Sequence, residues 1–394
     1  MLTAQFQYWD CKTRRPLGSA GVTVPGFGIQ KQRLCVWASS DHGRTFRIVG
    51  GDCCQNGDDA SLAQTPSSGT LLEAYMSNIG IGTGVPGLSL SRSTDNGRTW
   101  TDRLDVDKQV LQDRPWLVVE SERNVLISFT TAPGNVFVIR SKDKGRSWSV
   151  ARPVMVVPPE LVLSLNGEPT YDVARREIVL SYAYSSSHAA SDIGGAPGAI
   201  NIIGVARSKD HGATWTNEVA ARLPRGQGVL SLPTFTSDVR GHEYLAYDAA
   251  IGAHGVGTFL IRSSRDGSWS HPVRVDPPGG SAMEPSVRAT GDGHVAVAYY
   301  HAGAGDARDV VRRWTTDVAT SRDGAGTFTY ASASNHVVYV GTESNASATL
   351  FDLLAIEIGR DGFVNVAWTD DGTTYPTDVK TQIEFARQAI GDPL

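Results

Sequence analysis

Short apolar runs rich in β-branched and aromatic residues, separated by turns that contain glycine, asparagine or aspartate, recur along the whole chain. Residues 115–120 and 125–129 form two such runs, and a third, residues 135–140, follows them directly. Runs of this kind, bounded by turn residues, predict β-strands. No convincing helical pattern interrupts them, so we expect an all-β chain built from consecutive antiparallel strands.

A short motif, Ser-x-Asp-x-Gly-x-Thr/Ser-Trp/Phe, follows the third strand of each group. Four complete copies and two degenerate ones begin at Ser39, Ser93, Ser141, Ser208, Ser263 and Ser321. The aspartate can accept hydrogen bonds from its own turn, the glycine allows positive φ, and the aromatic residue packs back on the sheet. The motif therefore predicts a hairpin turn between the third and fourth strands of a repeat.

The spacing of the motif predicts a β-propeller. The five intervals between Ser39 and Ser321 average 56.4 residues, and four strands in about 50 residues are typical of a propeller blade. At this spacing 394 residues correspond to about seven four-stranded antiparallel blades. Seven blades are favoured, and six would result if the two terminal segments shared one blade. Residues 1–394 are expected to form a single domain, closed by pairing of its N- and C-terminal strands.

Composition excludes several classes of partner. The 36 basic and 41 acidic side chains give a net charge of −5, without the basic patch that nucleic acid binding requires. No apolar run is long enough to cross a membrane, and no signal peptide is visible at the start. All four cysteines lie in the first 54 residues, where disulfides and free thiols are equally expected. No histidine stands near them at zinc spacing.

In a propeller, the entrances of the first strands and the exits of the second strands share one face, and binding sites are expected there. The entrances carry Asp59, Asp113, Arg114, Glu168 and Glu284. The exits carry Tyr182, Tyr247, Asp248, Tyr299, Tyr300, His301, Trp368 and Asp370. Aromatic rings and paired carboxylates suit a sugar, because carboxylates provide acid and base at a glycosidic oxygen. The structural alternative is that the carboxylates cap turns and the tyrosines fill space between blades.

The repeated motif resembles the Asp box (BNR repeat) of sialidases and related β-propeller proteins, and the resemblance covers essentially the whole chain. It implies that the motif aspartates are structural and lie on the face opposite the active site. These aspartates are Asp41, Asp95, Asp143, Asp210, Asp266 and Asp323. The resemblance also implies a secreted or extracytoplasmic protein.

Sialidases bind the substrate carboxylate with three arginines and use a Tyr–Glu nucleophile with an aspartate as acid/base. The first of these arginines lies in a Phe/Tyr-Arg-Ile-Pro motif. The nearest string here, residues 22–25, has Thr23 in the place of that arginine. Arg114 is the arginine that stands at a strand entrance.

The resemblance and the residues together favour a sialidase-like glycoside hydrolase acting on an extracellular glycan. In this hypothesis Asp113, Glu168 or Glu284 is the acid/base, and Tyr182 or Tyr299 lies near the anomeric centre. The expected substrate-binding residues are Arg114, Asp59, Tyr247, Asp248, Tyr300, Trp368 and Asp370.

Two alternatives stay open. One is a propeller-type polysaccharide lyase in which His301 with Tyr299 or Tyr300 moves protons while Arg114 neutralises a uronate. The other is a non-catalytic propeller that binds a glycan or a protein. A monomer without a cofactor is expected in each case, and a structural calcium ion is conceivable but not predicted.

Overall fold

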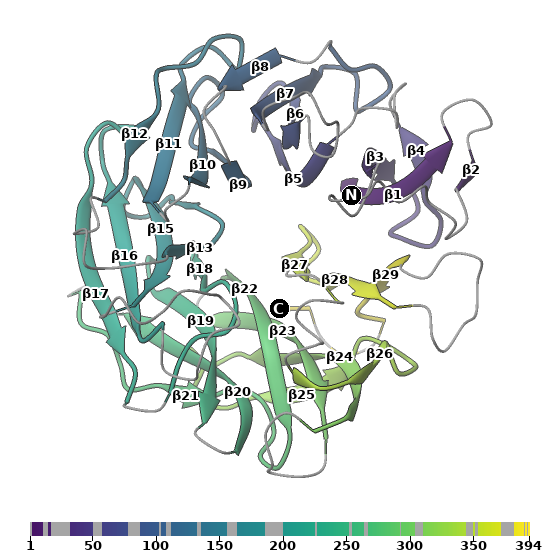
Figure 1. Ribbon diagram of the computed structural model, residues 1–394, viewed down its shortest axis with the longest axis vertical. Coiled ribbons are helices and arrows are strands. Elements are labelled where there is room, and N and C mark those ends of the chain that lie inside the picture. Colours follow the sequence, from purple (N-terminus) through teal and green to yellow (C-terminus); the bar gives the residue numbers. More distant parts are fainter. Residues whose placement is uncertain are drawn as a thin grey trace, which may run out of the picture. The chain divides into compact units, whose positions relative to one another are not determined.

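The structure is a computed structural model, shown as a ribbon in Figure 1. It describes residues 2–10, 15–16, 32–49, 57–77, 87–101, 104–107, 112–131, 135–155, 164–185, 200–224, 227–251, 254–263, 267–291, 293–303, 310–343, 350, 354–371, 382–389, 391 and 393–394. The strands in these residues are numbered β1 to β29. The chain divides into two compact units, Met1–Val156 with Ser208–Trp215, and Val157–Arg207 with Thr216–Leu394.

The first unit contains three antiparallel sheets. The first, ordered β2-β1-β3-β4, consists of β1 (Leu2–Asp10), β2 (Arg15–Pro16), β3 (Gln32–Ala38) and β4 (Arg47–Val49). The second, ordered β5-β6-β7-β8, consists of β5 (Gly57–Gln64), β6 (Leu71–Ser77), β7 (Gly87–Ser93) and β8 (Leu104–Asp107). The third, ordered β12-β11-β10-β9, consists of β9 (Gln112–Val119), β10 (Val125–Thr131), β11 (Asn135–Ser141) and β12 (Arg152–Pro153). Apolar side chains that alternate along the central strands, such as Leu72, Leu88, Ile127 and Phe129, form the core between the second and third sheets.

The second unit contains four antiparallel sheets. The first consists of β13 (Ser164–Asn166), β14 (Thr170–Asp172), β15 (Glu177–Tyr184), β16 (Ile202–Ser208) and β17 (Thr216–Arg222). The second consists of β18 (Thr234–Ser237), β19 (Glu243–Ile251), β20 (His254–Ser263) and β21 (Val273–Arg274). The third consists of β22 (Ser281–Thr290), β23 (His294–Ala302), β24 (Arg312–Ser321), β25 (Thr329–Ser332) and β26 (Tyr339–Gly341). The fourth consists of β27 (Ala355–Ile358), β28 (Val364–Asp370) and β29 (Gln382–Arg387).

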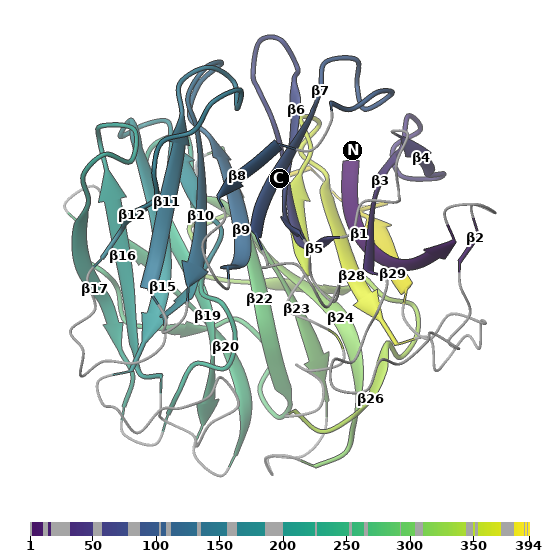
Figure 2. The same ribbon diagram turned by 45° about the horizontal axis from the view of Figure 1, so that its top comes forward.

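These sheets confirm the all-β fold class and the four-stranded antiparallel propeller blade. In the sheets β5–β8, β9–β12 and β18–β21 the strands lie in chain order, as β22, β23 and β24 also do in Figure 2, whereas the first sheet has the order β2-β1-β3-β4. Among the described residues, six sheets have at least four strands, which agrees with the alternative prediction of six blades, and the favoured count of seven is slightly off. The difference lies in the β27–β29 sheet, whose three described strands are followed by no motif turn and no fourth strand. Closure by the terminal strands stays a prediction.

The repeated motif forms the hairpin turn expected of it. At Asp95, one carboxylate oxygen accepts bonds from Ser93 Oγ and the Thr99 amide, both 2.9 Å, and the other accepts a 2.6 Å bond from Thr99 Oγ1. Gly97 takes a φ of +80°, which glycine adopts without strain. The hydrogen bonds from Thr99 lower the pKa of Asp95 to about 2. Both carboxylate oxygens thus accept hydrogen bonds within the turn, which is what a structural role requires.

Four further motif turns repeat this bonding. They contain Asp41, Asp143, Asp210 and Asp323. In the last, Ala325 takes the left-handed conformation, φ +66°, that glycine has in the complete copies. Asp266, Cys11, Cys53 and Cys54 lie outside the described residues, as does the side chain of Cys35. The described residues contain no helix with the length and apolar character of a membrane span.

Candidate functional site

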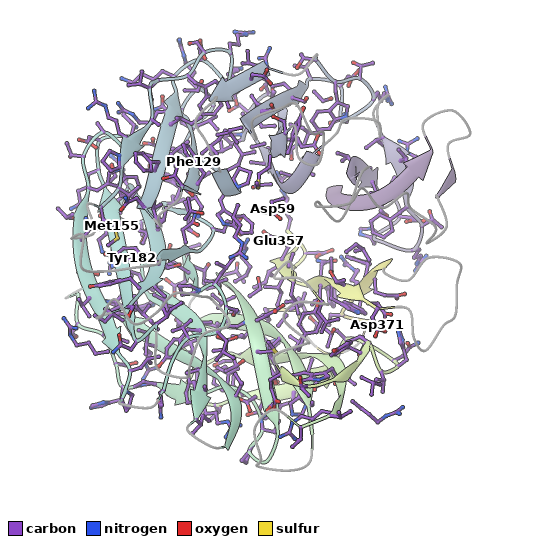
Figure 3. The ribbon with its side chains drawn as sticks, in the orientation of Figure 1. Asp59, Phe129, Met155, Tyr182, Glu357 and Asp371 are labelled. Atoms are coloured by element: carbon purple, nitrogen blue, oxygen red, sulfur yellow. The ribbon has the colours of Figure 1, made fainter. Side chains whose placement is uncertain are left out.

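Three first strands carry a polar residue with left-handed backbone at the predicted entrance. The φ angle is +34° at Asp59, +54° at Arg114 and +55° at Glu284. Asp59, labelled in Figure 3, and Glu284 each stand at a β-bulge, where the strand register shifts. This conformation costs a non-glycine residue on the order of 1–3 kcal/mol, and bulges re-aim side chains beside functional sites. The entrances singled out in the sequence are therefore unusual backbone positions.

In the first unit, the described entrance side chains are those of Asp59 and Arg114, and both are partly exposed. Asp113 pairs with Thr130 through β9 and β10, but its side chain lies outside the described residues. Its role as acid/base stays a prediction.

In the second unit, Asp248 anchors the backbone of Glu284. The Oδ2 atom of Asp248 accepts a 3.0 Å bond from the Glu284 amide and a 2.8 Å bond from Ser231 Oγ, while Oδ1 accepts the amides of Leu230 and Ser231 at 3.0 Å. Burial raises the pKa of Asp248, and these bonds act in the opposite direction. Asp248 lies buried, accepts four hydrogen bonds and positions the strained residue, and its expected role in substrate binding stays a prediction.

Tyr300 lies close to Glu284, and both side chains are buried. Its hydroxyl donates to the carbonyl of Thr369 at 3.2 Å and accepts from the Thr369 amide at 3.0 Å. Burial, and then the negative charge of Glu284, raise the pKa of Tyr300 well above its ordinary value. Tyr300 is thus a neutral link between β23 and β28, where Trp368 is buried as well.

His301 is oriented by a carboxylate across the sheet. Its Nδ1 lies 2.9 Å from Asp317 Oδ2, and the other oxygen of Asp317 accepts a 2.8 Å bond from Ser332. The ring of Tyr299 meets that of His301 edge-on, with centroids 6.2 Å apart. A Cβ at Gly280 would lie 3.0 Å from Nε2, so glycine leaves room beside this nitrogen. A histidine oriented in this way can act as a general base.

A second histidine–carboxylate pair lies at the end of β28. His336 Nε2 is 2.7 Å from Asp370 Oδ2, and His336 Nδ1 is 2.7 Å from Asn335 Oδ1. Burial and then the charge of Asp370 raise the pKa of nearby Glu384. Asp370 is buried, and its Oδ2 atom is occupied by His336. Its expected contact with substrate stays a prediction.

The remaining tyrosines at strand exits fill space. Tyr182, labelled in Figure 3, is buried, bonds to Asn217 at 3.1 Å and stacks on Tyr184 at 5.8 Å. Tyr247 is buried and stacks on Phe259 at 5.7 Å. Burial raises the pKa of both Tyr182 and Tyr247. Their packing agrees with the structural alternative for these residues.

A partly exposed polar cluster of the second unit contains Glu168, Arg288 and Glu357. Arg288 Nη2 donates to Glu168 Oε2 at 2.6 Å, and Arg288 Nε donates to Glu357 Oε1 at 3.0 Å. The two carboxylates thus share one guanidinium group. Their side chains are 34% and 63% exposed, and that of Arg288 is 21% exposed. Burial lowers the pKa of Arg288, but Glu168 and Glu357 raise it more.

Local sequence explains how this cluster is placed. Glu168 follows Gly167, where a Cβ would lie 1.9 Å from the Pro233 carbonyl, and the first strand is interrupted there between β13 and β14. Arg288 lies in β22, and Glu357, labelled in Figure 3, lies in β27. The break and the two strands together bring three distant segments to one point.

Sequence reasoning identified Glu168 but missed Arg288, Glu357, Asp317 and His336. A signal for Glu357 exists, since it is a charged residue inside an otherwise apolar first strand. Among the described residues, no group of three or more His, Cys, Asp or Glu side chains could hold a metal ion.

Comparison with known proteins finds no matching family model and no matching curated protein. Among solved structures, the chain resembles the ulvan lyase of polysaccharide lyase family PL25, with a TM-score of 0.54, 13% identity, and coverage of 94% of this chain and 93% of that one. It also resembles the α-L-arabinanase of Penicillium chrysogenum, with a TM-score of 0.52, 14% identity, and coverage of 84% and 92%. A third is the Hadza microbial sialidase Hz136, with a TM-score of 0.51, 16% identity, and coverage of 91% and 73%. At such identities the likeness shows the fold alone, and that fold is the β-propeller.

Proposed function

We propose that this protein is a carbohydrate-active enzyme, a sialidase-like glycoside hydrolase that acts on a glycan outside the cytoplasm as a monomer. The five described motif turns support membership of the Asp-box propellers, because each uses its aspartate as that repeat does. Enzymes that process sugars are also among the solved structures of similar fold.

The observation that carries the proposal is that Glu168 and Glu357 both bond to the guanidinium group of Arg288. Most glycosidases use two carboxylates that flank the glycosidic bond, one as acid/base and the other as nucleophile or base. A separation of about 5–5.5 Å between the two carboxyl groups would give the retaining reaction, in which the second carboxylate forms a covalent glycosyl intermediate, and a wider one would give the inverting reaction. Glu168 and Glu357 are the exposed carboxylates that would perform these two steps, and Arg288 positions both.

An activity screen on sialosides, neutral glycosides and uronate polymers tests the proposal. Release of reducing sugar without an unsaturated product identifies a hydrolase. We expect Glu168→Gln and Glu357→Gln each to lower kcat by about 10²–10⁴-fold. Sodium azide should restore turnover in the alanine variants and yield glycosyl azides, whose anomeric configuration assigns the two roles.

Glu218→Gln is the matched control. Glu218 also pairs with an arginine, Arg207, which keeps other carboxylate partners when Glu218 is removed, just as Arg288 keeps Glu357 when Glu168 is removed. Its activity should equal that of the wild type. Full activity in both Glu168→Gln and Glu357→Gln would place the site elsewhere.

The orientation of His301 by Asp317 favours a second candidate, a polysaccharide lyase. Here His301 Nε2 takes the proton α to a uronate carboxylate, the bond to the leaving oxygen breaks, and a C=C bond forms as that oxygen is protonated. The hydroxyl of Tyr299 has no hydrogen-bond partner among the described residues, and the Tyr299 ring meets that of His301 edge-on, which makes Tyr299 the candidate proton donor. Reducing sugar together with an unsaturated product, both lost in His301→Asn, would favour this reaction over hydrolysis. If no substrate yields either product, the screen would favour a non-catalytic propeller that binds its ligand.

A further inference from the structure

A cavity of about 490 Å³ opens between two neighbouring sheets of the second unit, β18–β21 and β22–β25. Its volume falls within the roughly 300–1,000 Å³ typical of ligand pockets. Its lining includes His242, Tyr244, Arg262, Ser268, Trp269 and Ser270. We call it the turn-end cavity.

The turn-end cavity lies at the opposite end of these sheets from the entrance residues. It is bordered by Tyr244 near the start of β19 and by Gly293 after the end of β22. Glu284 stands near the start of β22, and His301 near the end of β23. A ligand in the cavity is therefore separate from any reaction at the strand entrances.

An aromatic ring with a fixed orientation lines the cavity. Trp269 is partly exposed, its Nε1 lies 3.4 Å from Glu218 Oε1, and its backbone forms a β-bridge with Ser263. A partly exposed indole in a pocket can pack against the apolar face of a sugar ring at little cost in conformational entropy.

Polar groups around this ring match the hydroxyls of a sugar. His242 Nδ1 is 2.8 Å from the buried carboxylate of Asp238, which sets the tautomer and leaves Nε2 outside this bond. Ser268 and Ser270 are also in the lining, and the hydroxyl of Ser270 bonds to the Arg262 amide and the His271 carbonyl.

Arg262 brings a positive charge to the cavity. Among the described residues, the Arg262 guanidinium donates to a neutral acceptor, the Gly324 carbonyl, and to no carboxylate. The carboxylate of Asp323, also at the cavity, accepts hydrogen bonds from Ser321 and Thr327 of its own turn. An exposed arginine beside an aromatic ring recognises carboxylate or sulfate groups.

We propose that the turn-end cavity is a second glycan-binding site, which takes a sugar unit bearing a carboxylate or sulfate group. Trp269 packs on the sugar ring, and Arg262 pairs with the anionic group. The site would retain a polymer on the enzyme while the entrances act on another part of it. The inference rests on the proposed function in taking a glycan as the ligand, but its test measures binding and not turnover.

Affinity electrophoresis of the full chain tests the proposal, with native gels that contain alginate for carboxylates, carrageenan for sulfates, or dextran as a neutral polymer. The wild type should be retarded in at least one anionic gel and not by dextran. Trp269→Ala and Arg262→Gln should each raise the Kd obtained from retardation by roughly tenfold. Arg322→Gln is the matched control, since Arg322 also donates to a backbone carbonyl, that of Pro393, and lies outside the lining.

Several outcomes would overturn the site. They are no retardation of the wild type in either anionic gel, equal retardation by dextran, or variants that bind as the wild type does. Two controls show whether a loss of retardation comes from misfolding. Trp269→Phe should keep most of the retardation, and thermal unfolding should show that the variants are folded. If Glu168→Gln stays active but retardation still depends on Trp269, the proposed reaction site fails while the cavity stands.

Discussion

Arg207 Nη2 donates a 2.9 Å hydrogen bond to Glu243 Oε2, and Arg207 Nη1 contacts Glu243 Oε1 at 2.5 Å. This bidentate pair joins β16 to β19 and thus two neighbouring sheets of the second unit. The same carboxylate also binds Arg175. The side chain of Glu243 is fully buried, and that of Arg207 is 13% exposed. Burial lowers the pKa of Arg207, but the carboxylates of Glu243 and Glu218 raise it more.

Replacing Glu243 should be strongly destabilising. Glu243→Ala leaves two guanidinium groups without the carboxylate they share, and breaking a buried ion pair costs about 3–5 kcal/mol. Urea unfolding should show this loss in the free energy of unfolding. Glu218→Gln removes a partly exposed partner of the same arginine and should cost less than about 1 kcal/mol. Equal losses in the two variants would contradict a dominant role for the buried pair.

Glu73 of β6 predicts an unusual dependence of stability on pH. Burial raises the pKa of its carboxyl from 4.5 to about 7. Between these values the folded chain binds more protons than the unfolded chain, so stability falls as pH rises from 4.5 through 7 and then levels off. The free energy of unfolding should be up to roughly 3 kcal/mol lower at pH 8 than at pH 4 because of this group.

Glu73→Gln should remove this loss, because glutamine carries no charge at either pH. The measurement is denaturant unfolding at several pH values from 4 to 8, in which the difference between variant and wild type should grow with pH. Glu122→Gln, in the same unit, should change in the opposite direction, because hydrogen bonds from Lys144 and Ser68 lower the pKa of Glu122. A constant difference for Glu73→Gln would mean that the group titrates normally.

The motif glycines differ in how tightly they are packed, although their backbones agree. Gly212 and Gly267 have φ angles of +74° and +82°. A Cβ at Gly212 would lie 2.4 Å from Leu126 Cδ1, whereas one at Gly267 would meet nothing within 4 Å. Gly267→Ala should therefore lose about 1–2 kcal/mol from left-handed backbone strain. Gly212→Ala should lose a further 1–3 kcal/mol from overpacking. Thermal unfolding that ranks the two variants equally would rule out the packing contribution.

Features set by neighbouring residues were predictable from the sequence. The motif turn depends on hydrogen bonds between Ser93, Asp95 and Thr99, which lie within seven residues of one another. The terminal strands β1, β3 and β29 were also expected, because alternation along a strand is local. The unusual backbone at Glu284 coincides with an acidic residue before a proline, a pattern that is visible in the sequence.

Contacts that depend on which segments meet were not predictable in this way. Asp317 faces Tyr299 and bonds His301 only because of the register between β23 and β24. Asp248 was expected to line a site, yet it is buried and accepts four hydrogen bonds from Leu230, Ser231 and Glu284. Glu168 and Glu357 lie 189 residues apart in the sequence and meet through the side chain of Arg288.

Arg288→Lys tests whether this meeting point serves a reaction or only stability. Lysine keeps the positive charge, but a single ammonium group cannot present the paired Nε and Nη2 donors to Glu168 and Glu357. If Arg288 positions both carboxylates, kcat on a substrate found in the screen should fall by about 10²-fold, because small displacements of reacting groups are costly. The pH profile of kcat should also move, since the carboxylates lose their shared partner. A purely structural arginine would instead lower the unfolding temperature and leave the pH profile of the folded enzyme unchanged. Arg322→Lys, at an exposed arginine away from the cluster, should alter neither kcat nor stability.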